Sequence, residues 1–322
     1  QDALQHWQKT ENNVWLANLL NNLGVLEHLT GEYEQAILSY EKALHHARVS
    51  GNVRYEAFVL AGIGDVYADL EAITEARAAY QQARVIAERI QVNYLRIYLN
   101  AQEASLFGVD GDETQGFNLI EAARALTRHE TQTMETVMCD LEYAGLKIRQ
   151  GQAQDALGML EKAAAFFEAE GQKVQREKAD LYLVLAYGQI GNHEKLLEKV
   201  LKLLAYLNSD VPSASLVAAA NRHYDLLVRL RELDYLGGQM EELFDRIDQF
   251  RGQLPVLRRH MRQHPVVVPF GPPAVLIRAL GKMQVKVNNH LVTSSDWQTQ
   301  SARDLFCLIL ARPEGLTKEE IG

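Results

Sequence analysis

The sequence predicts an all-α solenoid of tandem antiparallel helix pairs, followed by a small, truncated β/α segment at the C-terminal end. Three observations predict this fold. Small residues recur every 40 positions, apolar residues between them recur three and four positions apart, and the helical pattern stops after His264, where prolines concentrate. Spacings of three and four place apolar side chains on one helical face, and a fixed period of this length indicates repeated helical units.

The 40-residue period is visible in five registers of the sequence. They are Gly24, Gly64, Ala104 and Ala144; Ala36, Ala76, Gly116 and Ala156; Gly31, Glu71, Gly111, Gly151 and Gly191; Tyr40, Tyr80, Ile120, Leu160 and Val200; and Ala43, Ala83, Ala123, Ala163 and Leu203. Two helices approach closely where neither presents a bulky side chain, so we expect small residues to meet small residues there. We expect the tyrosines to fill the adjacent groove.

Element by element, the spacing predicts helices over residues 16–31, 33–49, 53–70, 73–90, 93–108, 113–128, 132–150, 153–170, 173–190 and 193–207. Turns are expected at residues 50–52, 171–172 and 208–210. A sixth, degenerate pair is expected at 212–232 and 236–250, because the end units of solenoids are atypical. A terminal helix over 254–263 would follow. The predicted domains are a repeat domain at 1–250, a terminal helix and proline-rich linker at 251–274, and a further domain at 275–322.

The first two units carry a recognisable motif. Leu20-x-x-Leu23-Gly24, Gly31-x-Tyr33-x-x-Ala36, Tyr40 and Ala43 occur at one spacing, and Leu60-x-x-Ile63-Gly64-x-x-Tyr67, Ala76, Tyr80 and Ala83 repeat it. This spacing resembles the tetratricopeptide repeat. The resemblance implies a right-handed superhelix with the first helix of each pair on a concave, ligand-binding wall. Two departures are a step of 40 rather than about 34 residues and the absence of the proline near the end of each unit.

The resemblance also implies which side chains face the groove. The first three units supply Asn18, Asn21, Val25, His28, Phe58, Ala61, Asp65, Tyr98, Ala101 and Ser105, and later units supply Met138, Leu141, Gly145, Lys178, Leu181 and Leu185. The early positions mix amide, carboxylate, hydroxyl and aromatic groups, which suits a peptide, a protein or a small-molecule effector. The alternative is packing against a neighbouring helix, particularly for Leu181 and Leu185.

Signals for catalysis are weak. Gly62-Ile63-Gly64 falls inside a predicted helix, and no phosphate-binding loop is present. Cys139 and Cys307 fit neither a disulfide framework nor a zinc spacing. His260 and His264 share a helical face, yet no acidic or sulfur partner lies near them in the sequence, so we interpret them as solvated. We therefore expect no catalytic residues, no cofactor and no metal site.

The pattern changes after His264. Residues 265–273 contain four of the seven prolines, which ends the helical array. Alternating apolar and polar residues predict strands over 275–281 and 283–288, with a third segment at 289–293. An amphipathic helix is expected over 301–310, and a second helix opens at 316–321 with Thr317 and Glu320 as a capping box.

Several features of this segment resemble the start of the OmpR-type winged helix of bacterial transcriptional activators. They are Leu280-Gly281-x-x-x-Val285, Trp297, Arg303-Asp304-Leu305-Phe306 and Leu316-Thr317-Lys318-Glu319-Glu320-Ile321. The resemblance covers about 46 residues, and the recognition helix would lie beyond Gly322. Residues 251–290 contain basic but no acidic side chains, and Arg258, Arg259, Arg262, Arg278, Lys282 and Lys286 could lie along DNA phosphates. The alternative is a solvated linker face, with Arg251 part of the same stretch.

A repeat arm joined to a winged helix resembles the MalT-like regulators. The leading hypothesis is a cytoplasmic sensor and interaction arm, part of a longer bacterial transcriptional activator, that binds an effector or partner in the groove. DNA would be bound only through the complete winged helix, and a homo-oligomer is left open. The absence of a long apolar run predicts no membrane partner. A repeat scaffold without a role in transcription is the alternative, and an enzyme with a site hidden in the groove is the third hypothesis.

Overall fold

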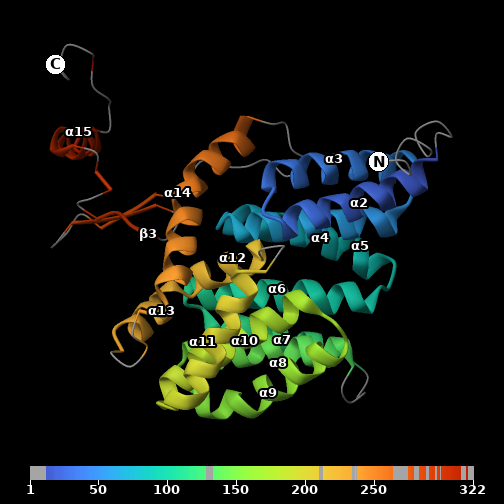
Figure 1. Cartoon of the computed structure of the whole chain (residues 1–322). Coiled ribbons are helices and arrows are strands. Elements are labelled where there is room, and N and C mark those ends of the chain that lie inside the picture. The colour runs from blue at the N-terminus through green and yellow to red at the C-terminus, as the bar shows by residue number, and fades with distance from the viewer. Residues whose placement is uncertain are drawn as a thin grey trace. The chain divides into compact units, whose positions relative to one another are not determined.

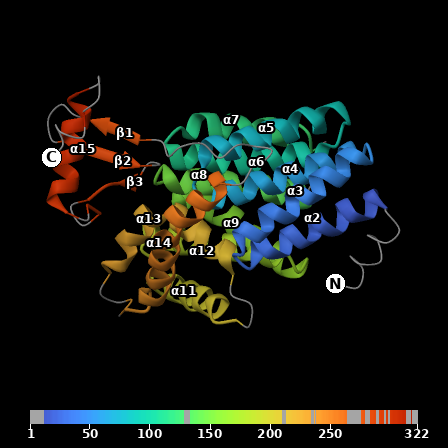
Figure 2. The same cartoon turned by 90° about the horizontal axis from the view of Figure 1, so that it is seen from above.

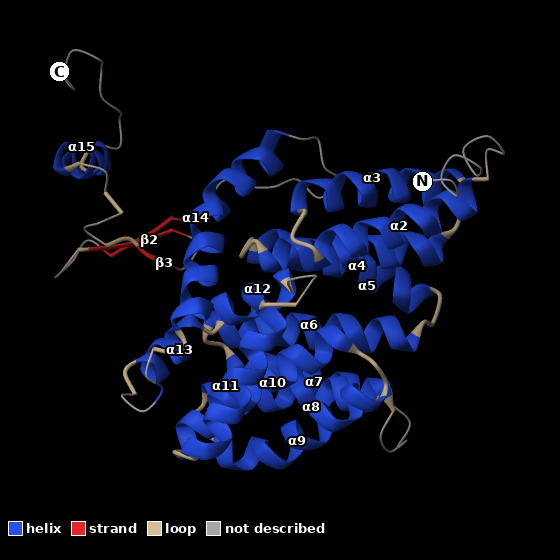
Figure 3. Cartoon of the chain, viewed as in Figure 1, coloured by secondary structure: helices blue, strands red, loops and turns tan. Residues whose placement is uncertain are grey.

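The computed structural model describes residues 12–127, 133–209, 213–233, 236, 238–263, 275–278, 283–287, 290–293, 296–297, 299–312 and 317. The chain divides into two compact units, residues 1–271 and 272–322. The described part of the first unit is helical and that of the second contains a small sheet and a helix, as Figures 1 and 3 show. The predicted solenoid of helix pairs with a small β/α segment is confirmed.

The repeat helices begin about 40 residues apart, as the sequence period predicts. The first helices of the pairs are α2 (Asn13–Leu29), α4 (Val53–Asp69), α6 (Asn93–Asp110), α8 (Met134–Arg149) and α10 (Lys173–Ile190). The second helices are α3 (Tyr33–Val49), α5 (Ile73–Arg89), α7 (Glu113–Arg124), α9 (Ala153–Ala169) and α11 (His193–Leu207).

One of the repeated registers marks the turn inside each helix pair. The residues at positions 31, 71, 111, 151 and 191 all have positive φ angles, between 56° and 83°. Glycine adopts this left-handed conformation without a steric cost, and it is the usual residue after a helix C-terminus. Glu71, with φ 56°, is the exception in this register. Its side chain accepts a hydrogen bond from Asn221.

The glycines inside the helices make room for tyrosines. A Cβ atom on Gly24 would lie 2.9 Å from the ring of Tyr40, and one on Gly64 would lie 2.3 Å from Cε1 of Tyr80. The structure thus corrects our expectation that small residues meet small residues at these positions. Tyr40 and Tyr80 are each 1% exposed, so the rings are held in the core between the two helices of one pair.

The end unit differs from the prediction in two ways. The expected helix at 212–232 is broken at His223 into α12 (Ala214–Arg222) and α13 (Tyr224–Arg231). The expected helices at 236–250 and 254–263 form one helix, α14 (Glu241–Gln263), with Pro255 inside it. Burial of Phe250, Leu254 and Met261 along α14 explains why this helix continues past the proline.

The solenoid closes on itself through this end unit. Each first helix contacts the next, from α2 to α10, and α12 then contacts α10, α2 and α4. Helix α14 is the last described helix of residues 1–271, and it contacts α3 of the first repeat (Figures 1 and 2). Ala218 of α12 and Phe250 and Leu254 of α14 belong to the same apolar cluster as Leu20 and Leu44. The inner helices therefore form a closed ring.

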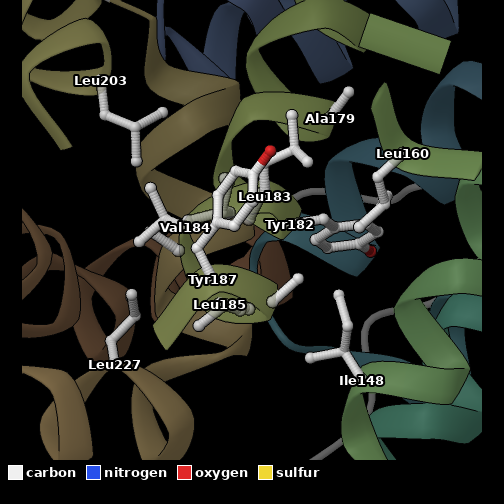
Figure 4. Close-up of a cluster of buried hydrophobic side chains, with 14 of the residues drawn as sticks. Ile148, Leu160, Ala179, Tyr182, Leu183, Val184, Leu185, Tyr187, Leu203 and Leu227 are labelled. Carbon is white, nitrogen blue, oxygen red and sulfur yellow. The ribbon is translucent and has the colours of Figure 1, made fainter. Parts of the chain in front are cut away.

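A second apolar cluster surrounds α10. Tyr182, Leu183, Val184 and Leu185 pack there against side chains from α8, α9, α11 and α13 (Figure 4). Helix α10 is buried nearly all round at this point, because two neighbouring pairs and the end unit meet on it. This cluster stabilises the part of the ring around α8 and α10.

The second unit contains a three-stranded antiparallel sheet. Strand β1 (Val275–Arg278) pairs with β2 (Gln284–Val287), which pairs with β3 (His290–Leu291). Helix α15 (Gln300–Leu310) follows, and the ring of its Phe306 lies 5.2 Å from that of Trp297. The predicted sheet and helix are confirmed. The proline-rich stretch at 265–273 and the predicted helix at 316–321, apart from Thr317, lie outside the described residues. Among the described residues, no helix is both long and apolar enough to cross a membrane.

Candidate functional site

A cavity of about 400 Å³, partly open to solvent, is lined by the ring of inner helices. Every first helix contributes to its wall, as the resemblance implied, and α12 supplies a wall that the sequence did not predict. The residues that line it include Val25, His28, Tyr40, Asp65, Asp69, Tyr80, Tyr98, Gln102, Glu142, Lys178, Ala219 and Arg222. Apolar surface with a few convergent polar groups is the usual character of a ligand pocket.

The cavity brings together half of the predicted groove residues. Those that line it are Val25, His28, Asp65, Tyr98, Ala101, Met138, Leu141 and Lys178. Asn18, Asn21, Phe58, Ala61, Ser105, Gly145, Leu181 and Leu185 do not line it. The structure therefore narrows the predicted groove to the part near the C-terminal ends of α2 and α4 and the facing parts of α6, α8 and α10.

The side chains outside the cavity have other contacts. Asn18 Nδ2 donates to Tyr55 Oη at 2.7 Å, and Ser105 Oγ donates to the carbonyl oxygen of Gln102 at 2.8 Å. Leu181 and Leu185 are at most 1% exposed in the cluster around α10. For these two leucines the packing alternative holds. Phe58 is partly buried and packs against the apolar cluster that contains Leu20 and Leu44.

A charged triad links α2, α4 and α12 at the cavity wall. His28 Nε2 lies 2.8 Å from Oδ2 of Asp69, and Arg222 Nη1 donates to Oδ1 of Asp69 at 3.0 Å. Burial alone would lower the pKa of His28, but the hydrogen bond and the negative charge of Asp69 outweigh it and raise that pKa. Burial likewise works against ionisation of Asp69, yet His28 and Arg222 hold its pKa below the usual range. The three side chains therefore favour one another's charged forms.

Asp65 lies one helical turn before Asp69 and has a different environment. Its Oδ1 accepts a hydrogen bond from Tyr80 Oη at 2.8 Å, and its Oδ2 accepts one from Tyr98 Oη at 2.7 Å. Burial raises the pKa of Asp65 to about 6, because the two hydroxyl donors offset only part of the lost hydration. Asp65 is thus a desolvated carboxyl group at the cavity surface.

A third carboxylate, Glu142 of α8, is paired with a cation on the neighbouring inner helix. Lys178 Nζ of α10 donates to Glu142 Oε1 at 2.6 Å, and Tyr182 Oη lies 3.4 Å from Oε2. Glu142 is 5% exposed. Both sides of the cavity therefore carry compensated ion pairs, with Asp65 between the aromatic rings.

The polar wall residues that sequence reasoning missed include Gln102, Glu142, Asp69 and Arg222. The first two and Arg222 occupy one register of the 40-residue period, since 102, 142 and 222 differ by 40 and 80. Extending the groove registers by this column would have found them. Asp69 follows Asp65 by four residues on the same helical face, which is a local signal.

The predicted DNA-backbone residues have dissimilar environments. The structure corrects the prediction for Arg258, because its guanidinium is buried and its Nε donates to the carbonyl oxygen of Leu70 at 2.6 Å. Arg259 and Arg278 are exposed, Lys286 is half-buried, and Arg251 lies over the ring of Tyr224 at 4.2 Å. The side chain of Arg262 and the whole of Lys282 lie outside the described residues.

The described residues contain no group of three or more His, Cys, Asp and Glu side chains that could hold a metal ion. Cys139 is buried, and burial raises the pKa of its thiol to about 12. His260 has an acidic partner after all, because Glu34 of the first unit lies 2.5 Å from its Nδ1. The side chain of His260 is nevertheless 44% exposed, so only the expectation that it has no acidic partner is corrected, and His264 lies outside the described residues.

Comparisons with known proteins agree with this architecture. A family model described as tetratricopeptide repeat matches residues 1–49 and 16–89. No curated protein matches the chain. A similar solved structure is the crystal structure of a Rap protein complexed with Competence and Sporulation Factor, with a TM-score of 0.58 and 15% identity, covering 75% of this chain and 76% of that chain. The first 89 residues of the chain are thus a tetratricopeptide-repeat region, and the similar structure supports the same kind of fold beyond them.

Proposed function

We propose that the chain binds an effector or partner in the cavity and passes the result to its C-terminal unit, as the sensor and interaction arm of a bacterial transcriptional regulator. The observation that supports this most directly is the ion pair between Asp69 and Arg222 at the cavity wall. It joins the second repeat to α12, and α12 belongs to the segment that continues through α14 toward residue 272.

The fold comparisons support a protein or peptide as the bound molecule. Tetratricopeptide repeats present stacked helices as binding surfaces, and the similar Rap protein was solved as a complex with Competence and Sporulation Factor. In this chain α12 occupies part of the concave surface. A ligand would therefore contact the cavity that α12 leaves, or would replace α12 on the surface of α2 and α4.

Either mode of binding would act on the end unit. A ligand shifts an equilibrium between two arrangements only if it binds one of them better. Contacts to both His28 of α2 and Ala219 of α12, which line the same cavity, would favour the closed ring. A ligand that pairs with Asp69 in place of Arg222 would favour an open ring. In both cases α14, which packs on α3, would change its environment.

The C-terminal unit would be the output. Its described strands and helix follow the order expected of the first part of an OmpR-type winged helix. In this proposal the chain acts by binding and not by catalysis, and it contacts DNA only when the remainder of the winged helix is present.

Hydrogen exchange tests the sensing step. The full chain would be measured alone and with pools of short synthetic peptides, with the backbone amides of α12 and α14 as the readout. We expect one or more pools to change exchange in α12 and α14 as well as in α2 and α4. A variant with Arg222→Ala should show the altered α12 exchange without ligand. Peptide binding that leaves α12 and α14 unchanged would contradict the proposed coupling.

A repeat scaffold with no role in transcription is the alternative. The family match favours it as much as the first proposal, because that match concerns residues 1–89 alone. DNA binding by a longer protein that continues past Gly322 separates the two, measured across a salt series because phosphate contacts weaken steeply with salt. Specific binding supports the regulator, and peptide binding without any DNA binding supports the scaffold.

A further inference from the structure

We infer that the ligand of this cavity carries a cationic nitrogen, an ammonium or a guanidinium, which pairs with Asp65. This inference rests on the proposed function, since it assumes that the cavity binds a ligand. It goes further by assigning the ligand a charge and a contact atom. Three carboxylates, those of Asp65, Asp69 and Glu142, lie in the cavity wall.

Two of those carboxylates already have cationic partners. Asp69 is paired with His28 and Arg222, and Glu142 is paired with Lys178. Asp65 has hydrogen bonds from two neutral hydroxyl groups, and no lysine, arginine or histidine of the described residues forms an ion pair with it. The wall therefore contains one carboxylate whose charge the protein solvates only with neutral donors.

The geometry leaves room for a further donor. An ionised carboxylate has about four lone-pair sites, and the tyrosines of α5 and α6 occupy one on each oxygen of Asp65. The remaining acceptor capacity lies in a cavity that Asp65 itself lines. A buried charge without a partner is costly, so a ligand cation that pairs with it gains the interaction without having to displace a protein cation.

The aromatic surroundings favour an organic cation over a small hydrated ion. The ring of Tyr98, which is half-buried, lines the same cavity as Asp65, while Tyr40 and Tyr80, each 1% exposed, pack in the core of the same wall. Aromatic faces attract ammonium and guanidinium groups and also pack against the carbon chain that carries them. A desolvated carboxylate among aromatic rings thus has the two features with which proteins hold amines.

The other charged groups near Asp65 set the conditions for binding. His28 of α2 lowers the pKa of Asp65 through its positive charge, and Asp69 of α4 raises it. Arg222 of α12 is occupied by Asp69. Because Asp65 releases its proton near pH 6, the cation should bind more tightly at pH 7.5 than at pH 5.

The cavity volume limits the cation to a small body. About 400 Å³ accommodates a group of the size of an aromatic amine or one to three amino-acid residues. The shared chemistry is a protonated amine, and it can come from a free small amine or from the amino terminus or a basic side chain of a peptide.

Isothermal titration of the full chain at pH 7.5 tests the inference with four probes. They are 2-phenylethylamine, its neutral counterpart 2-phenylethanol, the tripeptide Phe-Gly-Gly, and the same tripeptide with an acetylated amino terminus. We expect each amine to bind at least ~10-fold more tightly than its neutral counterpart, because a hydrogen bond to a charged group contributes that much affinity. Tighter binding of the free tripeptide than of 2-phenylethylamine would identify a peptide source, and the reverse a small-amine source.

Two variants locate the effect. In Asp65→Asn the preference for the amines should fall to within ~3-fold of equality. Asp245→Asn, the same change at an exposed position on α14, should keep the full preference. Circular dichroism would confirm that both variants are folded.

The inference is overturned if no amine binds, if amine and neutral probe bind equally to the wild-type chain, or if Asp65→Asn keeps the preference. The proposed function can survive this result. Neutral peptides that change hydrogen exchange in α12 would leave the sensing proposal standing and remove only the assignment of a cationic ligand.

Discussion

Asn221 donates a hydrogen bond from Nδ2 to Oε1 of Glu71 at 2.6 Å, although 150 positions separate the two residues. Glu71 also lies 3.7 Å from Arg258 of α14, and it is the residue with φ 56° in a register otherwise occupied by glycine. A non-glycine residue in the left-handed region costs about 1 kcal/mol. The side chain that breaks the repeat pattern thus contacts both α12 and α14 from the second repeat.

Exchanging this glutamate for glycine should therefore destabilise the protein although it relieves the backbone. We expect Glu71→Gly to lower the free energy of unfolding by about 1–2 kcal/mol, because it leaves buried polar groups of Asn221 and Arg258 with fewer partners. Gln91, with φ 55° and an exposed side chain, is a matched control. Gln91→Gly should raise stability by roughly 0.5–1 kcal/mol. Urea unfolding followed by circular dichroism measures both, and a stabilising Glu71→Gly would contradict the assignment.

Removing the cation from the triad should be more damaging than removing an exposed one. Arg222→Ala leaves the buried Asp69 with His28 as its cationic partner, so we expect a loss of about 2–4 kcal/mol. Arg89 at the exposed end of α5 provides the comparison. Arg89→Ala should change stability by less than about 0.5 kcal/mol. Equal effects of the two substitutions in thermal or urea unfolding would show that the triad does not hold α12 in place.

The glycine–tyrosine contacts predict opposite effects for two identical substitutions. Gly64→Ala places a methyl group 2.3 Å from the Tyr80 ring, whereas Gly158 of α9 has no atom within 4 Å of its added Cβ. We expect Gly64→Ala to destabilise by about 1–3 kcal/mol through overpacking. Gly158→Ala should stabilise by up to about 1 kcal/mol through helix propensity. Thermal unfolding of the two variants checks the signs, and a neutral Gly64→Ala would mean that the pair separates readily.

The titration of Asp65 predicts a pH-dependent stability difference. In the unfolded chain this carboxyl loses its proton near pH 4, whereas burial keeps it protonated to about pH 6 in the folded chain. Unfolding therefore releases a proton between these values, and the contribution of Asp65 to stability falls as pH rises through this window. Asp65→Asn removes the effect, so the variant should gain up to about 1–3 kcal/mol relative to wild type above pH 6.

Urea unfolding at pH 4, 5, 6 and 7 measures this difference. The gain should be absent at pH 4 and reach its full size above pH 6. The exposed Asp245→Asn should show no such trend. A gain that stays constant over the whole range would indicate that Asp65 titrates normally in the folded protein.

The repeat pattern determined much of the fold from the sequence. The predicted helix at 33–49 has the same bounds in the structure, as have those at 173–190 and 193–207, because turns and small residues recur at fixed positions. The break at His223 and the continuous α14 were not predicted, since the end unit lacks those markers. Periodicity describes contacts between neighbouring units and contains no signal for a contact between the second unit and the sixth.

The candidate site, like the fold, could be predicted only in part from the sequence. Val25, His28, Asp65 and Tyr98 were predicted because they occupy repeat registers of the inner helices. Which of the sixteen groove positions would share a cavity depended on where α12 packs, and that depends on Asp69, Glu71 and their distant partners. Sequence reasoning could not exclude Asn18 and Ser105 from the groove. Their hydrogen bonds to a tyrosine hydroxyl and a backbone carbonyl group leave no recognisable pattern in the sequence.

The contact between α14 and α3 has a consequence for how this kind of protein can change its length. An open solenoid tolerates the duplication or loss of a unit, because each unit touches only its neighbours. Here a duplicated pair would turn α12 and α14 away from the first repeat, and Glu34 and His260 could no longer meet. Closure therefore fixes the number of repeats, and such a ring can diversify by substituting residues inside its cavity and not by growing.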